Sequence, residues 1–185
     1  FAMDREPVAA PSDLTRWQIQ TEVIRAVMDR RTTFLEERLA ADRLLPYGTL
    51  GAAMGRQSVQ EATALARLAV REAGGRLEPH RLVYREGRPQ IAGNITVNAE
   101  GNLHVLVMPT ELKGRPHHRL DVWVRGTFAA ACGMRGDTLV VSRDGERARL
   151  DRRPPMALEQ ARAALDNLLH LCQQARRHPL AFGPK

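Results

Sequence analysis

Apolar residues recur at intervals of three and four positions along the first part of the chain, which predicts amphipathic helices. The first helix begins at Ser12, whose hydroxyl is suited to cap it, and Asp13 lies in its first turn. A second helix is predicted over residues 32–44, and Pro46 and Gly48 would break it. The apolar positions of the first helix are Trp17, Val23, Ile24, Val27 and Met28.

The third predicted helix is followed by a change of pattern. It begins at Ser58, which would form a capping box with Glu61, and it ends at Gly74 and Gly75. From residue 76 onwards, apolar positions alternate with polar ones and short turns separate the runs. Residues 91–97 and 103–107 are therefore predicted to be paired strands, joined through "NAEGN".

The remaining part of the chain predicts a helix over residues 118–133, a hairpin over residues 137–150 and a last helix over residues 157–177. The hairpin would turn at Asp144 and Gly145. The order of the elements predicts an α+β fold in which helices cover a sheet. We expect the apolar stripe of the last helix to be mostly core, although part of it could contact another subunit: Leu158, Ala161, Leu165, Leu168, Leu169 and Cys172.

Composition limits the classes of protein to which the chain can belong. Of its 185 residues, 43% are hydrophobic and only 4% are aromatic, so aliphatic side chains must fill the core of one domain. The formal net charge is +7, and the pI is about 10.6. Such an excess favours an anionic partner, with nucleic acid first. The positive charges are scattered, however, and solvated faces of an arginine-rich protein would also explain them.

Cysteine usage and hydropathy indicate the compartment. Cys132 and Cys172 match neither a C-x-x-C motif nor a zinc-site spacing, and each lies in an apolar helical pattern. We therefore expect buried free thiols in a reducing cytoplasm. No stretch reaches the ~18 apolar residues of a membrane span, so no membrane partner is expected. Residues 1–11 are interpreted as a flexible arm and residues 179–185 as a truncated tail of a longer protein.

The stretch "MPTELKG" places a carboxylate and a lysine one residue apart at the end of an apolar run. Many metal-dependent nucleases arrange their reaction centre in this way, and Glu111 and Lys113 would be the pair. Magnesium needs several converging oxygen ligands, usually one or two carboxylates with water and phosphate. The metal then activates water for hydrolysis of the phosphodiester. The pair therefore needs an acidic partner on the preceding strand.

That acidic partner is missing from the sequence. No aspartate occurs between Asp42 and Asp121, and the candidate strand at residues 90–97 carries no acid. Glu111 also follows Pro109 by two residues, so we expect it to lie beyond the end of its strand. We interpret the Glu-x-Lys pair as a solvated turn.

The turn "KGRPHHR" is dense in basic side chains and could contact DNA. Lys113, Arg115, His117, His118 and Arg119 would neutralise phosphate charges and release counterions. The plainer interpretation is a solvated loop before a helix. Zinc binding is not expected, because no third or fourth ligand stands at a usable spacing.

The stretch "HRLVYREGR" is the second candidate for contact with DNA. Arg81, Arg85 and Arg88 surround Tyr84, and an exposed tyrosine among arginines could stack on an unpaired base. More often such a tyrosine pins a strand to the core. Further along, His104 alternates with its apolar neighbours and should occupy the opposite face of its strand in a structural role.

An ordered set of segments resembles the C-terminal region of the exodeoxyribonuclease V gamma subunit, RecC. The resemblance covers residues 12–185, and Gly183 departs from a common aromatic near its end. Its most specific parts are "RLLPYGTLG", "ELKGR" with "LDVWVR", and the closing "HPLAF" with "PK". It implies a restriction-endonuclease-like fold of the PD-(D/E)xK type, with a central mixed sheet flanked by helices. The helical lead-in would be residues 12–75, and the degenerate nuclease-like core residues 76–178.

The resemblance also implies a role without chemistry. The acids of active relatives would fall near Thr96 and Met108, neither of which binds a metal. The domain is thus expected to have no catalytic residue, metal or cofactor, while partner subunits use ATP and magnesium. The implied partners are the helicase subunits RecB and RecD together with DNA. The implied function is that of a strand guide or wedge and a docking scaffold in recombinational repair of double-strand breaks.

Two other functions remain open from the sequence. A working magnesium nuclease would combine Glu111 and Lys113 with acids from the helical part, such as Glu61 or Glu72. A stand-alone DNA-binding module would bind DNA tightly and with strong salt dependence. A docking domain, in contrast, should expose a contiguous apolar patch.

Overall fold

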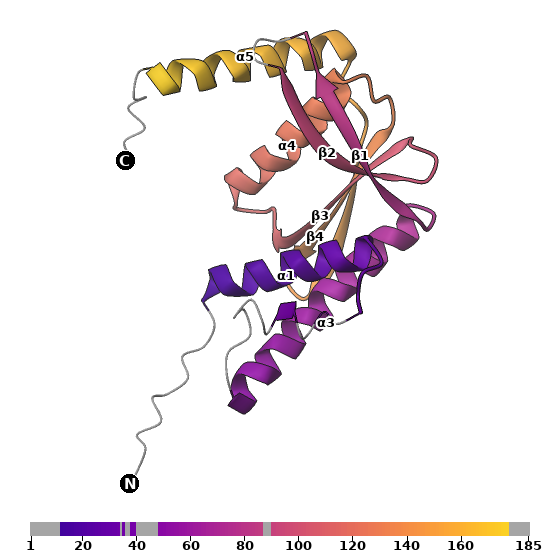
Figure 1. Cartoon of the computed structure of the whole chain (residues 1–185), viewed down its shortest axis with the longest axis vertical. Coiled ribbons are helices and arrows are strands. Elements are labelled where there is room, and N and C mark those ends of the chain that lie inside the picture. The colour runs from indigo at the N-terminus through magenta and orange to yellow at the C-terminus, as the bar shows by residue number, and fades with distance from the viewer. Residues whose placement is uncertain (1–11, 34, 36–37, 40–47, 87–89, 178–185) are drawn as a thin grey trace.

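The computed structural model describes residues 12–33, 35, 38–39, 48–86 and 90–177 (Figure 1). Most of the helix predicted at residues 32–44 lies outside these ranges, as do the predicted arm and tail. Within them the elements are α1 (Asp13–Met28), α3 (Gly48–Glu72), β1 (Leu77–Tyr84), β2 (Ile91–Asn98), β3 (Leu103–Glu111), α4 (Pro116–Ala131), β4 (Asp137–Asp144), β5 (Arg147–Arg153) and α5 (Leu158–Arg177).

The five strands form one mixed sheet in the order β1-β2-β3-β4-β5. β3 and β4 are parallel and are joined by α4, whereas the other neighbouring pairs are antiparallel. The predicted hairpin is confirmed, with Gly145 at a φ of 64° in its turn. Four helices of the described ranges flank the sheet, which confirms the α+β class.

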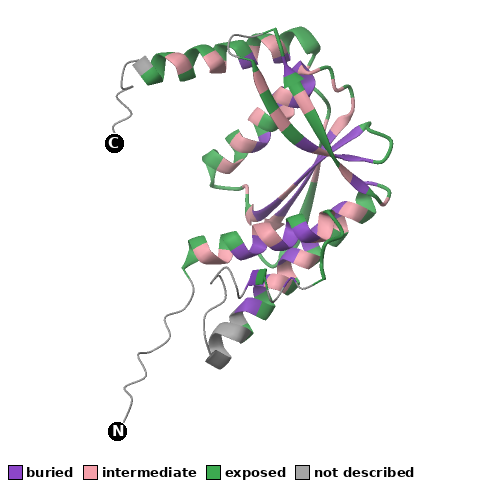
Figure 2. Cartoon of the chain, in the orientation of Figure 1, coloured by how far each residue is buried: buried purple, intermediate pink, exposed green. Residues whose placement is uncertain are grey.

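Helices cover both faces of the sheet (Figures 1 and 2). Side chains alternate between the two faces along β3 and β4, so each face presents apolar side chains to the helices on its side. Val105 of β3 and Val141 of β4 face α3 and are buried against it. Leu106 and Val140, one position along, are buried on the other face with Val122 of α4. The sheet is therefore a middle layer, and the helical lead-in packs against it rather than standing apart.

α1 and α3 form a helix pair. The start of α1 was predicted correctly, and the start of α3 was not. Ser12 caps α1 as predicted, its hydroxyl accepting a hydrogen bond from the Thr15 N–H at 3.1 Å. α3 begins at Gly48 and not at Ser58, so the predicted capping box is wrong. Ser58 is buried inside the helix, and the Glu61 side chain binds groups on other elements. The helical pattern simply continues upstream through small residues.

β3 runs further than expected. It includes Pro109 and ends at Glu111, so the expectation that Glu111 lies beyond the strand is wrong. Proline has no N–H to donate to a neighbouring strand, and it is tolerated where pairing is irregular. The register of β3 against β4 shifts between Val107 and Glu111, which accommodates it. α4 then starts with Pro116 in its first turn, two residues earlier than predicted.

The hairpin of β1 and β2 splays away from the rest of the sheet (Figure 1). The register of β2 with β3 rests on the single pair Val97 and His104. α4 and α5 fill the space beside this hairpin, where Ala161 and Leu165 of α5 are buried. The predicted apolar stripe is therefore core only in part.

The far half of α5 extends past α4 (Figure 1). Leu171 in that half is 50% exposed, and Leu158 at the start of the helix is 40% exposed. Cys172 is exposed and Cys132 is half-buried, which corrects the expectation of two buried thiols; both are free. In the ranges that the structure describes, no helix is both long enough and apolar enough to span a bilayer.

Candidate functional site

A cleft lies where α1 passes the C-terminal ends of the two parallel strands and the start of α4. Its volume is about 570 Å³. Its walls include Arg16 and Trp17 of α1, Glu111 of β3, Arg143 of β4 and Arg115 just before α4. The carboxyl ends of parallel strands are the usual place for ligand sites in open sheets. The cleft is therefore the candidate functional site.

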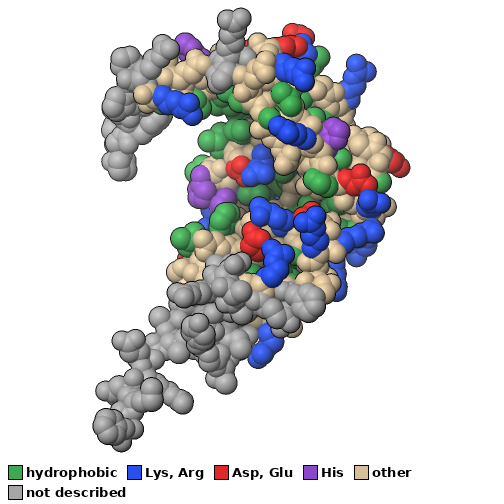
Figure 3. All heavy atoms as spheres, in the orientation of Figure 1, with side chains coloured by type: hydrophobic (Ala, Val, Ile, Leu, Met, Phe, Trp, Pro, Cys, Tyr) green, Lys and Arg blue, Asp and Glu red, His purple; other side chains and the backbone are tan. Residues whose placement is uncertain are grey.

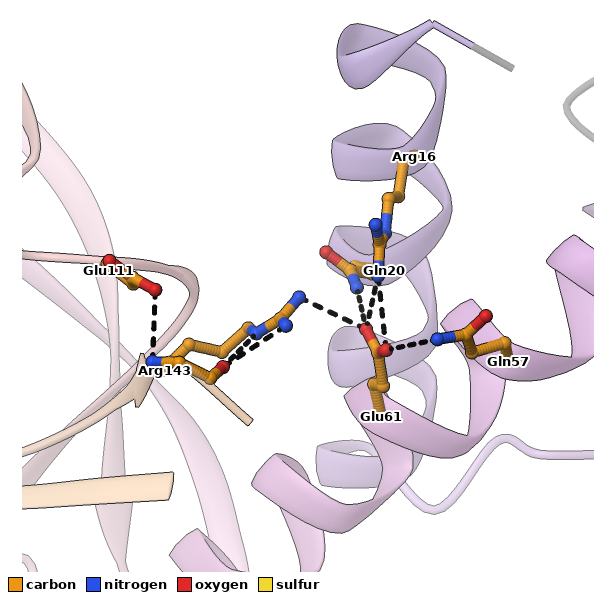
Figure 4. Close-up of polar contacts among 7 residues, drawn as sticks. Arg16, Gln20, Gln57, Glu61, Glu111 and Arg143 are labelled. Atoms are coloured by element: carbon orange, nitrogen blue, oxygen red, sulfur yellow. Dashed lines mark hydrogen bonds and ion pairs between the residues drawn. The ribbon is translucent and has the colours of Figure 1, made fainter. Parts of the chain in front are cut away.

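Glu61 of α3 holds a cluster of polar side chains beside this cleft (Figure 4). Arg16 donates to both of its carboxylate oxygens, at 3.1 and 2.9 Å. Gln20 and Gln57 each donate at 3.0 Å, and Arg143 donates at 3.1 Å. We call these five residues the Glu61 cluster. It joins α1, α3 and β4 through one carboxylate.

The cluster keeps Glu61 ionised. Burial raises the pKa of its carboxyl, but hydrogen bonding from Arg16 and the charges of Arg143 and Arg16 lower it more. The net pKa lies below its ordinary value of 4.5. A single negative charge is thus surrounded by two guanidinium groups, and its oxygens are occupied by donors.

Arg143 also links the cluster to Glu111. Its Nε and Nη2 donate to the carbonyl oxygen of Gly145 at 3.3 and 3.2 Å. The N–H of Gly145 in turn donates to Oε1 of Glu111 at 3.0 Å. Figure 4 shows Arg143 lying between Glu111 and Glu61. The guanidinium of Arg143 therefore pairs with Glu61, while Glu111 accepts its hydrogen bond from the N–H of Gly145.

The two positions that the resemblance matches to metal-binding acids carry no carboxylate. Thr96 is half-buried on β2, and Met108 is buried on β3 against α4. Glu72, the other acid considered for a nuclease, pairs with its neighbour Arg71 at 3.3 Å. The part of the chain that the structure describes has no group of three or more His, Cys, Asp or Glu side chains placed to hold a metal ion.

The structure brings part of the basic turn into the cleft. Arg115 and His118 line it, whereas Lys113, His117 and Arg119 are exposed nearby in the same turn and the start of α4. The rings of His117 and His118 are in contact, with centroids 4.1 Å apart. Burial, then the neighbouring His117 and Arg115 charges, lower the pKa of His118, and the charge of Asp121 opposes them.

The second group of candidates lies elsewhere. Arg81 and Arg85 are exposed on the hairpin that packs beside α5, away from the turn before α4 (Figure 1), and Arg88 lies outside the described residues. Tyr84 is only 2% exposed, and its hydroxyl donates to Asp166 of α5 at 3.0 Å. Tyr84 is thus wrong as a base-stacking residue, and its interpretation as an anchor to the core is confirmed.

His104 has the structural position that its alternation predicted. It is fully buried on the α4 face of β3, and its Nδ1 lies 3.5 Å from the hydroxyl oxygen of Thr138. Burial, followed by the charge of Arg125, lowers its pKa to about 4. The ring is therefore neutral at physiological pH.

Sequence reasoning missed the residues that build the cleft wall. Arg16 and Gln20 lie four residues apart on α1, and Gln57 and Glu61 lie four apart on α3. That spacing places each pair on one face of its helix, and it is the feature of the sequence that could have indicated these residues. Nothing local indicated that the two faces meet, or that Arg143 joins them.

The fold and the cleft together define an α+β domain whose parallel strands end at a mixed basic site with one carboxylate already neutralised. The family model of the RecC C-terminal domain matches residues 2–185, and the chain belongs to this family. The resemblance found in the sequence is therefore confirmed. RecC is a subunit of RecBCD, an exodeoxyribonuclease V of DNA repair and recombination. A search of curated proteins found no match.

Proposed function

We propose that the chain is a catalytically inactive nuclease-fold domain of a RecC subunit, which guides or wedges DNA strands and serves as a docking scaffold for the helicase subunits. Its fold would be of the restriction-endonuclease type. In this proposal the domain holds no metal or cofactor, and the partner subunits RecB and RecD use ATP and magnesium in the cytoplasm.

The Glu61 cluster carries the proposal that the domain does not cut. A magnesium site that combined Glu111 with Glu61, the acid linked to it through Arg143, would need free oxygens on Glu61. Both oxygens of Glu61 already accept hydrogen bonds, two of the donors being guanidinium groups. Displacing them would leave two arginines without their counter-charge, which is costly when the groups are partly buried.

The distribution of charge supports strand guidance. Basic side chains are spread over the face seen in Figure 3 and do not gather at one point. A protein along which DNA moves needs phosphate contacts that do not depend on sequence. Arg115, Arg119 and Lys113 supply such contacts beside the cleft, and Arg81 and Arg85 supply them on the hairpin.

Exposed apolar side chains on the outer helices support a docking role. Leu120 and Trp123 of α4 stand three residues apart and are 55% and 38% exposed. Leu171 of α5 is 50% exposed, on the half of the helix that extends past α4 (Figure 1). Apolar surface of this kind commonly marks a protein interface.

Incubation of the 185-residue chain with single- and double-stranded DNA and either Mg²⁺ or Mn²⁺ should give no cleavage products. The physical reason is that both oxygens of Glu61 are occupied and that the described residues contain no group of three or more His, Cys, Asp or Glu side chains placed to hold a metal ion. Gel analysis with an active nuclease in the same buffer is the check. Cleavage that disappears in Glu111→Ala would establish the alternative, a working magnesium nuclease.

Docking is tested with the immobilised chain as bait for RecB and RecD. Leu171→Asp should reduce recovery of a partner about tenfold, because a charge would be placed within an apolar contact. Asn167→Asp adds the same charge at an exposed polar position of α5 and should leave recovery unchanged. Equal recovery with both variants would exclude this part of α5 from the interface. Tight, salt-sensitive DNA binding without any recovery of partners would favour a stand-alone DNA-binding module.

A further inference from the structure

An aromatic ring stands on the wall of the cleft with much of its surface in solvent. Trp17 of α1 lines the cleft and is 39% exposed, although tryptophan is usually well buried. The adjacent lining residues include Arg16 of α1 and Arg115 before α4. An indole beside guanidinium groups is the combination that single-stranded nucleic-acid sites use, with stacking for the base and charge for the backbone.

Two polar atoms in the same wall lack partners. Nε of Arg16 and the hydroxyl oxygen of Thr110 are shielded from solvent, and neither forms a hydrogen bond with a described residue. Both residues line the cleft. Buried polar atoms are nearly always paired, but these two are shielded from solvent and so offer no contact to a ligand in the cleft.

Basic side chains stand at the start of α4. No side chain caps this helix, and no acidic residue lies in its first turn. Pro116 has no N–H, and the N–H groups of His118 and Arg119 donate to the carbonyl oxygen of Arg115 at 3.2 and 3.3 Å, so the positive charge at this end comes from side chains. Arg115 is exposed and forms no ion pair with any described residue, and His118 follows in the first turn. Charge is therefore available here for a ligand.

We propose that the cleft binds a segment of unpaired DNA, with a phosphate held by the side chains of Arg115 and His118, and a base stacked on Trp17. This inference rests on the proposed function and assigns a site to it. Duplex DNA would not fit this arrangement, since its bases are stacked on one another and cannot cover the indole. The volume of about 570 Å³ lies within the usual range for small-ligand sites.

The Glu61 cluster gives this site its rigidity. Arg16 is the residue immediately before Trp17, and its guanidinium is held by both oxygens of Glu61. The turn of α1 that carries the indole is thereby fixed against α3 and β4. Asp13 and Glu111 also line the cleft; Arg16 and Arg143 share the charge of Glu61, so Arg115 is the lining arginine that has no ion pair among the described residues. Glu111 is moreover occupied by the N–H of Gly145.

The test measures binding of a fluorescein-labelled oligothymidylate of about 12 nucleotides to the 185-residue chain by fluorescence anisotropy. Trp17→Ala should weaken binding about tenfold, and Trp17→Phe should recover much of that loss, since its ring still stacks. Arg115→Gln should weaken binding several-fold and reduce its salt dependence. Melting curves of the variants establish that each is folded.

Two matched controls separate this site from general charge and from exposed aromatic surface. Trp123 is exposed to the same degree, 38%, but lines a different pocket, so Trp123→Ala should change binding less than twofold. Arg149 is exposed on β5, and Arg149→Gln removes one charge away from the cleft. Duplex DNA should compete poorly with the oligothymidylate.

The inference is overturned if Trp17→Ala binds the oligonucleotide like the wild type, or if Trp17→Ala and Trp123→Ala weaken binding equally. It is also overturned if the wild-type chain does not bind the oligonucleotide. These outcomes do not contradict the docking role or the absence of cleavage, because partner recovery and gel analysis measure those two properties separately. Loss of partner recovery with normal oligonucleotide binding would instead contradict the proposed docking role and leave the cleft assignment standing.

Discussion

Tyr84→Ala is expected to lower the free energy of unfolding by about 4 kcal/mol, the range found when buried aromatic rings are truncated. Tyr84 is 2% exposed at the end of β1, in a cluster with residues of α4 and α5: Ala130, Ala131, Ala161 and Leu165. Three of these neighbours are alanines, which cannot extend into the space of the ring. Removal should therefore open a cavity where the end of β1 packs against α4 and α5.

Tyr84→Phe separates the ring from its hydroxyl. It keeps the packing and loses only the hydrogen bond to Asp166, which is worth about 1 kcal/mol. Urea unfolding followed by circular dichroism measures both variants. Val83→Ala, at the exposed neighbouring position, should cost clearly less than Tyr84→Ala. A Tyr84→Ala protein with wild-type stability would contradict the role of Tyr84 as an anchor. A Tyr84→Phe protein that is stable but has lost DNA binding would support contact between Tyr84 and DNA.

Glu61→Ala is the second large effect, with an expected loss of about 2 to 3 kcal/mol. The side chain is 26% exposed and is contacted by two arginines and two glutamines. Removing the carboxylate leaves Arg16 and Arg143 facing each other without a counter-charge. Removal of one partner from a partly buried charge cluster costs more than the net stabilisation of the intact cluster, because the remaining charges stay desolvated.

The effect of Glu61 depends on pH with a definite sign. Its pKa in the folded protein lies below the ordinary value of 4.5, so the folded state binds its proton less readily than the unfolded state does. The stabilisation is therefore fully present above about 4.5, and it is lost as the pH falls through the lower, folded pKa. The difference in unfolding free energy between wild type and Glu61→Gln should shrink below that pH.

Glu72→Ala is the matched control for Glu61. It removes a carboxylate from the same helix whose ion pair is with the adjacent, exposed Arg71, and it should cost less than about 0.5 kcal/mol. Urea titrations at neutral pH and in the acid range would measure all of these variants. Equal losses at Glu61 and Glu72, or a Glu61→Gln deficit that persists unchanged in acid, would show that the Glu61 cluster does not stabilise the domain.

The pattern of the chain determined the elements that depend on neighbours in sequence. Ser12 caps α1 because its hydroxyl reaches an N–H three residues on, and Gly145 turns the β4–β5 hairpin because it adopts a positive φ. Apolar periodicity located α5, and alternation placed His104 on the opposite face of β3. The α+β class and the membership of the RecC C-terminal domain family also followed from the sequence.

Contacts between distant residues were decided by the tertiary structure alone. Glu61 meets Arg16 across 45 positions and Arg143 across 82, and Tyr84 meets Asp166 across 82. Periodicity says which face of a helix is apolar, but it does not say which charge will stand opposite which when the faces pack. The same limit explains Cys172, which lies on an apolar stripe and is nevertheless exposed because α5 runs past the helix that would have covered it.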